Sequence, residues 1–514
     1  MPTVSMAKSP LSLALLGLTG GLISSMAYPD NAIWFAIFPA VALMIYAITR
    51  ASKKSVWVIG FLTGFTFYAS QIPWMTVYLG PVPWLALSIL EGTIFSLGAV
   101  AINRSWRASV FQDSPILKSL ALASLWVARE WVACNFPYGG FPWSRLALSQ
   151  SNSPLANWVF WGGNSLLSFV IVFATVLAMI TWSNRLKPSH WGSSPVAALL
   201  ALVFVVPLVT PISSKAENGS IDVAAVQGNA NAGLFANPKP GSILKNHLDA
   251  SKPLLSQKTP DVVIWPENAA DSNPMETPSA QKQVEDFTKR IDAPLIFGTI
   301  TSRGDEIFNS SILWRQNIGP VDWYDKKRPV AFGEYVPDRP FFRLLAPDLI
   351  DLIPRGYSFG ERDGIFEISD VKKSKVKIGT MICFEVAVDD ITRDLVQQNA
   401  EILAVQTNNS DFGTTNESAQ QLAIAKLRAI ESGRAVVNIS TVGLSAIILP
   451  TGEVVDSLPS YTPGIMRQEL PLRSSLTPAM SVGGFLEIVN NFSALGQILF
   501  VFWIGKRRRL QDGK

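Results

Sequence analysis

The segment VKIGTMICFE, residues 376–385, is a short β-branched run that ends in a thiol and an acid. Its length and its content of Val, Ile and Thr are typical of a buried strand. Comparable runs occur at Ile221–Val226, Val262–Trp265, Leu295–Thr299, Ile402–Gln406 and Val436–Ser440. Apolar residues at helical spacing lie between them, at Ser279–Ile291, Asp390–Gln398 and Glu417–Arg434. This alternation predicts an α/β domain whose buried strands are covered by helices.

On both sides of this domain the chain becomes strongly apolar. The 514 residues are 48% hydrophobic and 16% charged, against about 25% charged in soluble proteins. A membrane span needs roughly 20 mostly apolar residues, and eight such runs occur at Leu11–Ala27, Ile33–Thr49, Val56–Ile72, Val82–Ile102, Ile116–Cys134, Trp158–Trp182, Val196–Thr210 and Gly484–Ile504. We therefore expect a multi-pass helical membrane domain (1–213), an α/β domain (214–475), and a last span with a basic tail (476–514).

The basic residues predict the orientation of these spans, because cytoplasmic loops collect Lys and Arg. On the other side of the membrane the short loops hold one basic residue, Arg145. The basic residues on the predicted cytoplasmic side are Lys8, Arg50, Lys53, Lys54, Arg104, Arg107, Lys118, Arg185, Lys187, Lys506, Arg507, Arg508 and Arg509. We expect both termini in the cytoplasm and the α/β domain outside the cytoplasmic membrane. Cleavage after Ala27, as in a signal peptide, is an alternative that leaves this orientation unchanged.

Composition excludes several classes of function. The net charge of +4 is too small to indicate nucleic-acid binding. The only histidines are His190 and His247, so a zinc site of the usual spacing is not expected. We interpret Cys134 and Cys383 as unpaired thiols, and we expect neither a metal nor a cofactor.

Three polar positions follow strand-like runs, where α/β sheets bind their ligands. Glu267 ends the segment VVIWPE (262–267), Lys326 ends WYDK (323–326), and Cys383 ends the segment quoted first. Together they supply a base, a cation and a nucleophile, which a covalent acyl-transfer mechanism needs. Each alone has a structural alternative. Cys383 would be a buried thiol, Glu267 a helix cap, and Lys326 part of a solvated basic turn.

These three motifs resemble the Glu-Lys-Cys triad of the nitrilase, or carbon-nitrogen hydrolase, superfamily. With the eight predicted spans, the whole chain resembles the apolipoprotein N-acyltransferase family within it. Further matching positions are the segments GFPW (140–143), VQGN (226–229) and FGE (332–334), Asn408, and the helix end 428–434. The resemblance implies an α-β-β-α sandwich, with Cys383 as nucleophile, Glu267 as general base and Lys326 as stabiliser of the oxyanion.

The resemblance also implies supporting residues and substrates. Supporting roles fall to Glu334, Glu385, Tyr324 and Phe384, the last standing where the family commonly has Tyr. Candidate substrate contacts are Trp143, Asn408, Phe341 and Phe342. The implied acyl donor is a membrane phospholipid, phosphatidylethanolamine, and the implied acceptor is the α-amino group of a diacylglyceryl-cysteine at an apolipoprotein's N-terminus. The apolar stretch 329–357 is interpreted either as arms that contact lipid or the site, or as an internal packing loop.

Two other classes of function remain open on the residues. The first is a membrane-tethered amidase or nitrilase, in which water resolves the thioester. The second is a transporter or a non-catalytic lipid-binding protein, in which the three residues are structural. A simple tether needs one span, and transporters of this size keep their polar residues within the membrane. Eight predicted spans beside a large external domain therefore favour the acyltransferase.

Overall fold

The computed structural model describes residues 9–111, 114–183, 195–230, 232–233, 236, 238–353, 356–369 and 375–512. The chain forms two compact units, which are described separately: Met1–Thr210 with Ser481–Lys514, and Pro211–Met480. Lys8, Arg185 and Lys187, used above to predict the orientation, lie outside the described residues.

The first unit is helical. Its helices are α1 (Pro10–Ser24), α2 (Ile37–Arg50), α3 (Val56–Ala69), α4 (Met75–Leu79), α5 (Pro81–Arg107), α6 (Pro115–Asn135), α7 (Val159–Ser183), α8 (Pro195–Val209) and α15 (Gly484–Asp512). Within the described residues, four helical segments are long and apolar enough to cross a membrane: Pro10–Ala27, Pro81–Arg107, Pro154–Trp182 and Ala479–Ile504. Shorter apolar helices cover Trp34–Arg50, Val56–Ala69 and Pro195–Val209. The chain is therefore a membrane protein with several long apolar helices.

The second unit contains two six-stranded sheets. The first has the order β12 (Gly464–Pro471), β1 (Ser220–Gln227), β2 (Val262–Ile264), β3 (Leu295–Arg303), β4 (Glu306–Arg315) and β5 (Gly319–Asp325). The second has the order β11 (Val454–Leu458), β10 (Ser445–Ile448), β9 (Ala435–Ser440), β8 (Ile402–Thr407), β7 (Lys375–Ile382) and β6 (Ile365–Ser369). Strands β1, β2 and β3 are parallel, as are β7, β8 and β9, and the outer pairings are antiparallel.

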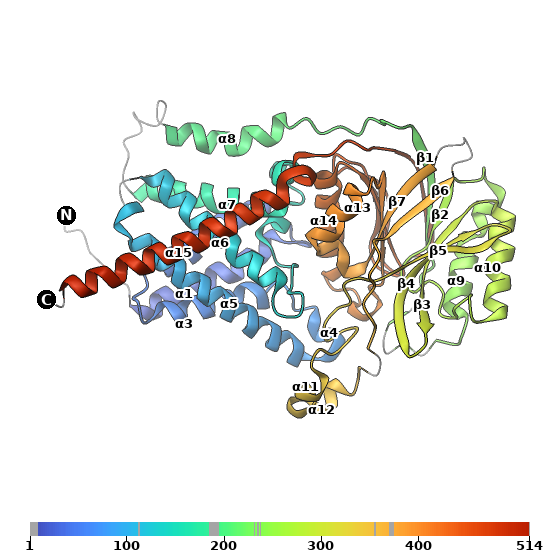
Figure 1. Ribbon diagram of the computed structural model, residues 1–514, viewed down its shortest axis with the longest axis horizontal. Coiled ribbons are helices and arrows are strands. Elements are labelled where there is room, and N and C mark those ends of the chain that lie inside the picture. Colours follow the sequence, from blue (N-terminus) through green and yellow to red (C-terminus); the bar gives the residue numbers. More distant parts are fainter. Residues whose placement is uncertain are drawn as a thin grey trace. The chain divides into compact units, whose positions relative to one another are not determined.

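Alternating side chains bind the layers of this unit together, because successive strand residues point to opposite faces. On β1, Val223 and Ala225 join the apolar cluster between the two sheets, which includes Ile378 of β7. Ala224 and Val226 face the other way and pack with residues of α9 (Ser242–Ser251) and α10 (Pro278–Ile291). Figure 1 shows α9 and α10 outside the first sheet, and α13 (Asp389–Gln397) and α14 (Glu417–Ser432) outside the second. The predicted two-sheet α/β domain is confirmed.

The topology brings three strand ends to one region. Strand β2 ends at Ile264, three residues before Glu267, and β7 ends at Ile382, immediately before Cys383. Strand β5 is antiparallel to β4, which is antiparallel to β3, so β5 again runs in the direction of β2 and β3. Its carboxyl end, followed by Lys326, therefore lies at the same edge of the first sheet as Glu267.

Candidate active site

Cys383 lies where strand β7 ends and a single turn of 3-10 helix, η8 (Cys383–Ala387), begins. Its backbone is in the left-handed region, with φ of 53°, a conformation that costs a non-glycine residue roughly 1–2 kcal/mol. Its half-buried side chain packs against the apolar cluster between the sheets. The sharp turn places the thiol beyond the carboxyl end of β7, where α/β sheets bind their ligands.

Glu385 holds this turn in place. Its Oε2 accepts a hydrogen bond from the Ile382 backbone N at 2.8 Å. Its Oε1 accepts from the Tyr324 hydroxyl at 2.8 Å and from the backbone N of Lys327 and Arg328 at 2.8 and 3.1 Å. Burial raises the pKa of Glu385, although these hydrogen bonds favour its ionised form. Glu385 and Tyr324 therefore join the turn at Cys383 to the segment after β5.

Three charged groups form a buried cluster after β2 and β5. The Lys326 Nζ lies 2.8 Å from Glu334 Oε2 and 3.6 Å from Glu267 Oε1. Lys326 is 1% exposed and Glu267 is 4% exposed. The Val330 backbone N donates to Glu334 Oε2 at 2.7 Å. Because charges are stable in an interior only when they are paired, these three groups depend on one another.

Asn309 of β4 aligns the two carboxylates. Its single amide nitrogen donates to Glu267 Oε1 at 2.7 Å and to Glu334 Oε1 at 2.9 Å. Both of its amide hydrogens are therefore used on the acids that flank Lys326. On the other side of Glu267, Gln406 of β8 donates to the Trp265 carbonyl at 2.6 Å and connects the second sheet to the end of β2.

Burial and the neighbouring charges set the protonation of the site. Burial raises the pKa of Glu267 to about 7, while the Lys326 ammonium and the Asn309 hydrogen bond oppose the rise. Burial acts to lower the pKa of Lys326, but the two carboxylates outweigh it and hold the pKa above its ordinary value, so the ammonium stays charged. Burial and the Glu267 carboxylate raise the pKa of the Cys383 thiol, and Lys326 opposes them.

These environments divide the roles between the residues. A thiol with a raised pKa is neutral at rest, so it needs a base close by before it can act as a nucleophile. Glu267 interacts with the Cys383 thiol, and its Oε2 has no other hydrogen-bond partner within the described part of the chain. The arrangement can move the thiol proton to Glu267 and hold developing negative charge with Lys326.

The other predicted residues lie in four different places. Phe341, on α11 (Arg339–Leu345), is 57% exposed, and the Phe342 ring meets the Phe332 ring at 4.8 Å. The Asn408 side chain bridges two loops, donating to the Ala232 carbonyl at 2.9 Å and accepting from Thr441 Oγ1 at 2.8 Å.

Trp143 belongs to the helical unit, where it is buried beside Trp74 and Phe141. Phe384 is half-buried in η8, one residue after Cys383. The roles of Trp143, Asn408, Phe341 and Phe342 in substrate binding stay predictions. Among the described residues, no group of His, Cys, Asp and Glu could hold a metal ion.

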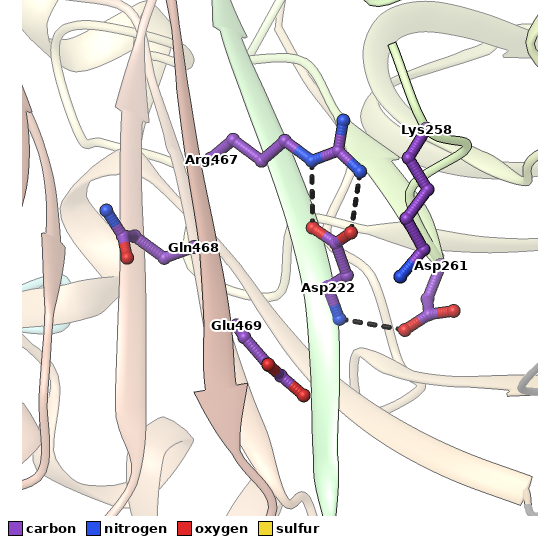
Figure 2. A pocket seen from close by; sticks show the side chains of 6 residues that line it. All are labelled: Asp222, Lys258, Asp261, Arg467, Gln468 and Glu469. Carbon is purple, nitrogen blue, oxygen red and sulfur yellow. Dashed lines mark hydrogen bonds and ion pairs between the residues drawn. The ribbon is translucent and has the colours of Figure 1, made fainter.

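A charged hollow of about 330 Å³ occurs elsewhere on the unit (Figure 2). Asp222 lies at the start of β1 and Asp261 immediately before β2, so the hollow is at the amino ends of these parallel strands. Arg467 makes a two-pronged ion pair with Asp222, at 3.0 and 2.6 Å, and the Asp222 backbone N donates to Asp261. Glu267 follows the opposite end of β2, so this hollow is separate from the candidate active site.

Comparison with known proteins identifies the family. A model of the apolipoprotein N-acyltransferase N-terminal domain matches residues 20–177, and a model of carbon-nitrogen hydrolases matches residues 222–475. An apolipoprotein N-acyltransferase of Mycolicibacterium smegmatis is 34% identical over 94% of this chain and 83% of that protein. The chain belongs to the apolipoprotein N-acyltransferase family. This confirms the resemblance seen in the sequence.

Other relatives extend this comparison. A family member of Vibrio vulnificus is 26% identical over 93% of this chain and 94% of its own length. Among solved structures, a mutant of a nitrilase-superfamily amidase from Nesterenkonia covers 50% of this chain and 93% of its own, with 15% identity and a TM-score of 0.38.

Two further residues of the candidate site, Asn309 and Gln421, were not predicted from the sequence. Gln421 of α14 donates from Nε2 to the Cys383 Sγ at 3.4 Å. The sequence does contain a signal for Asn309, because the polar residues 309–311 interrupt an otherwise apolar strand. In the structure these three residues are buried. A signal for Gln421 was its spacing of four residues from Glu417, which places both side chains on one helix face.

Proposed function

We propose that this chain moves an acyl chain from a phospholipid to the α-amino group of the N-terminal diacylglyceryl-cysteine of apolipoproteins, through a thioester on Cys383. The observation that carries the proposal is the cluster of Glu267, Lys326 and Glu334, in which Glu267 and Lys326 act on the Cys383 thiol and Glu334 pairs with Lys326. The membership of the chain in the apolipoprotein N-acyltransferase family supports the choice of substrates.

The first half-reaction forms the thioester. Glu267 takes the proton from Cys383 while the sulfur attacks the ester carbonyl carbon of the phospholipid. The Lys326 ammonium stabilises the resulting oxyanion. The carbon–oxygen bond to the glycerol then breaks, the leaving oxygen takes the proton from Glu267, and lysophospholipid departs. Glu267 is left as a carboxylate beside an acylated Cys383.

The second half-reaction passes the acyl chain to the acceptor. The neutral α-amino group attacks the thioester carbonyl, Lys326 again stabilises the oxyanion, and Glu267 takes the proton that the nitrogen releases. The carbon–sulfur bond breaks, and the sulfur recovers a proton from Glu267. The sequence is ping-pong, because lysophospholipid leaves before the apolipoprotein reacts. Glu334 keeps the Lys326 ammonium at the site throughout both steps.

We place the protein in the cytoplasmic membrane with eight spans, both termini in the cytoplasm, and residues 214–475 on the outer side between the segments 1–213 and 476–514. Support comes from the eight predicted runs, each of which falls on a helix. Helix α6 holds Lys118, Arg129 and Glu130 and is not among the four described helices that are long and apolar enough to cross a membrane. The donor that the family resemblance implies in such a membrane is phosphatidylethanolamine.

The exposed apolar side chains after Glu334 fit lipid substrates. Leu344 is 84% exposed and Leu345 is 68% exposed, beside Phe341 on the same short helix. Such groups gain free energy when they leave water for a lipid surface or an acyl chain. We propose that Phe341 and Phe342 contact the acyl substrates from this segment, and that Trp143 and Asn408 contribute further substrate contacts.

The test uses the full chain purified in detergent, with phosphatidylethanolamine and a synthetic diacylglyceryl-cysteine peptide. We expect a triacylated peptide from the unaltered chain and from Lys258→Ala, which changes an exposed lysine near the amino end of β2, the end opposite to Glu267. Cys383→Ala, Glu267→Ala and Lys326→Ala should each abolish the product while the protein still folds. Product formed by any of these three at the unaltered rate contradicts the proposal, and release of free fatty acid in place of peptide acylation indicates a hydrolase.

A further inference from the structure

A line of hydrogen-bonded side chains leads from helix α14 to the sulfur of Cys383. Gln421 Nε2 donates to Cys383 Sγ at 3.4 Å, and Gln421 Oε1 accepts from Asn409 Nδ2 at 2.8 Å. The same Asn409 nitrogen donates to Glu417 Oε2 at 2.8 Å. All three side chains of the line are buried, with exposed fractions of 1–2%.

The neighbours of Asn409 fix the direction of every amide in this line. Asn409 Oδ1 accepts hydrogen bonds from Ser440 Oγ at 2.6 Å and from Thr407 Oγ1 at 3.2 Å, and its nitrogen faces the side-chain oxygens of Glu417 and Gln421. Gln421 then presents its oxygen to Asn409, which leaves its N–H for the sulfur. A reversed Gln421 would place two donors against each other and an oxygen against the thiolate.

We propose that Gln421 is a further catalytic residue, which donates a hydrogen bond to the Cys383 sulfur as it becomes a thiolate, and that Asn409 and Glu417 are positioning residues that fix its direction. The proposal rests on the proposed function, because it takes Cys383 as the nucleophile. Hydrogen bonds to charged groups are stronger than those to neutral ones. The bond to Gln421 therefore strengthens when the Cys383 proton moves to Glu267.

The same bond serves both half-reactions. The sulfur carries negative charge when it attacks and again when it leaves as the acceptor amine takes the acyl chain, whereas the thioester sulfur is a weak acceptor. Interactions that are stronger in the transition state than in the ground state accelerate a reaction. The titratable groups that act on the Cys383 thiol are Glu267, Lys326 and Glu417, and burial raises the pKa of Glu417 to about 8. Gln421 is neutral, so it stabilises the thiolate without disturbing the pairing of Lys326.

The first test measures the reactivity of Cys383 with iodoacetamide from about pH 6 to about pH 9, in the full chain in detergent. Gln421→Met keeps the length of the side chain and removes the donor. Gln420→Met is the matched control, because it removes a buried amide from the adjacent position of the same helix. We expect Gln421→Met to lower the alkylation rate about tenfold and to raise the apparent thiol pKa by about one unit. A rate within about twofold of the control would overturn the proposal.

The second test concerns the positioning residues and separates their role from folding. Glu417→Gln keeps an acceptor for Asn409, whereas Glu417→Leu removes it. We expect Glu417→Leu to reproduce part of the loss seen with Gln421→Met, with an unchanged far-ultraviolet circular dichroism spectrum, and Glu417→Gln to retain the unaltered rate. Equal thiol reactivity in the two Glu417 variants would contradict the positioning role.

The failure of the proposed function would look different from the failure of this inference. If Cys383 is not the nucleophile, the unaltered chain carries no acyl group on Cys383, and Cys383→Ala still acylates the peptide. If only the inference fails, the unaltered chain forms the thioester and Gln421→Met forms it at the same rate.

Discussion

In the proposed mechanism Glu267 sets the pH dependence of the first half-reaction, since only its ionised form accepts the thiol proton. Burial raises its pKa to about 7, so the ionised fraction falls as the pH drops below that value. We expect the rate of thioester formation to fall about tenfold per pH unit below about 7 and to level off above it. Mass spectrometry of the Cys383 peptide, from reactions quenched at set times over a range of pH, measures this rate. A rate that is independent of pH between about 5 and 8 would contradict the assignment of Glu267 as the base.

Glu267→Gln removes the base and keeps the shape of the side chain. General base catalysis contributes about 10²–10⁴-fold, so we expect a loss of that size in the rate of thioester formation at pH about 8. The control is Glu285→Gln on α10, an exposed carboxylate.

Asn309→Ala tests the alignment of the carboxylates. The Asn309 hydrogen bond lowers the pKa of Glu267, so its loss leaves the pKa higher. We expect the midpoint of the pH–rate curve to move up by about one unit, as the loss of one hydrogen bond to a charged group predicts. The same mass-spectrometric assay measures this midpoint. An unchanged midpoint, or one that moves down, would show that Asn309 does not act on Glu267.

The sequence singled out Glu267, Lys326 and Cys383 because each follows a strand-like run, and strand ends meet at one edge of an α/β sheet. Their roles as a triad stay a prediction. It did not predict Asn309 or Gln421, whose partners come from other elements. A polar residue inside a strand or helix shows its role only when the residue that accepts its hydrogen bond is known. The structure shows specific contacts for Glu334 and Glu385, whose supporting roles the resemblance implies. Glu334 forms an ion pair with Lys326, and Glu385 accepts hydrogen bonds that hold the turn at Cys383.

At the scale of elements, the parallel central strands were predicted and the antiparallel outer strands were missed. Strands β7, β8 and β9 are almost continuously buried and read as apolar runs. Strand β11 is half-exposed, and β4 carries polar residues 309–311 in its interior, so neither shows a clear pattern. The helix expected to reach Arg434 ends at Ser432, because Gly433 adopts a left-handed conformation with φ of 64° that caps it.

Arg428 connects helix α14 to the turn that carries Cys383. It is fully buried and donates to the carbonyls of Val386 and Ala387 at 2.8 and 2.9 Å, and it pairs with Asp389 and Glu431 at 2.6 and 2.5 Å. Arg428→Met removes one partner of a buried ion pair, which costs about 3–5 kcal/mol. We expect the melting temperature in detergent to fall by roughly 10 °C. Arg343→Met, at an exposed arginine, should leave the melting temperature unchanged, and equal melting of the two variants would contradict the connecting role.

At the scale of the whole molecule, the sequence predicted a helical part and an α/β part from the change in apolar composition alone. The two compact units divide at Thr210 and Pro211 and again at Met480 and Ser481, a few residues from the expected boundaries. Composition cannot locate a boundary more closely, because the linking residues share the polar character of loops. The orientation of the spans rests on the distribution of Lys and Arg and stays a prediction.

That orientation predicts which positions are accessible from outside the cell membrane. In a chain with Cys134→Ser and Cys383→Ser, Lys258→Cys should react with an impermeant maleimide in cells whose outer layers admit the reagent. Lys53→Cys, in a predicted cytoplasmic loop, should react only after the membrane is permeabilised. Both lysines are exposed, so a reversed labelling pattern would contradict the topology.

The most direct test of the central claim is the mass of the Cys383 peptide after the full chain meets phosphatidylethanolamine. We predict an increase by one acyl group on this peptide, which disappears when a diacylglyceryl-cysteine peptide is added and reappears on the α-amino group of that peptide. An increase that disappears in water alone would contradict transfer and indicate a hydrolase. If no increase occurs with phospholipid while the lipopeptide is still acylated, Cys383 is not the residue that carries the acyl chain.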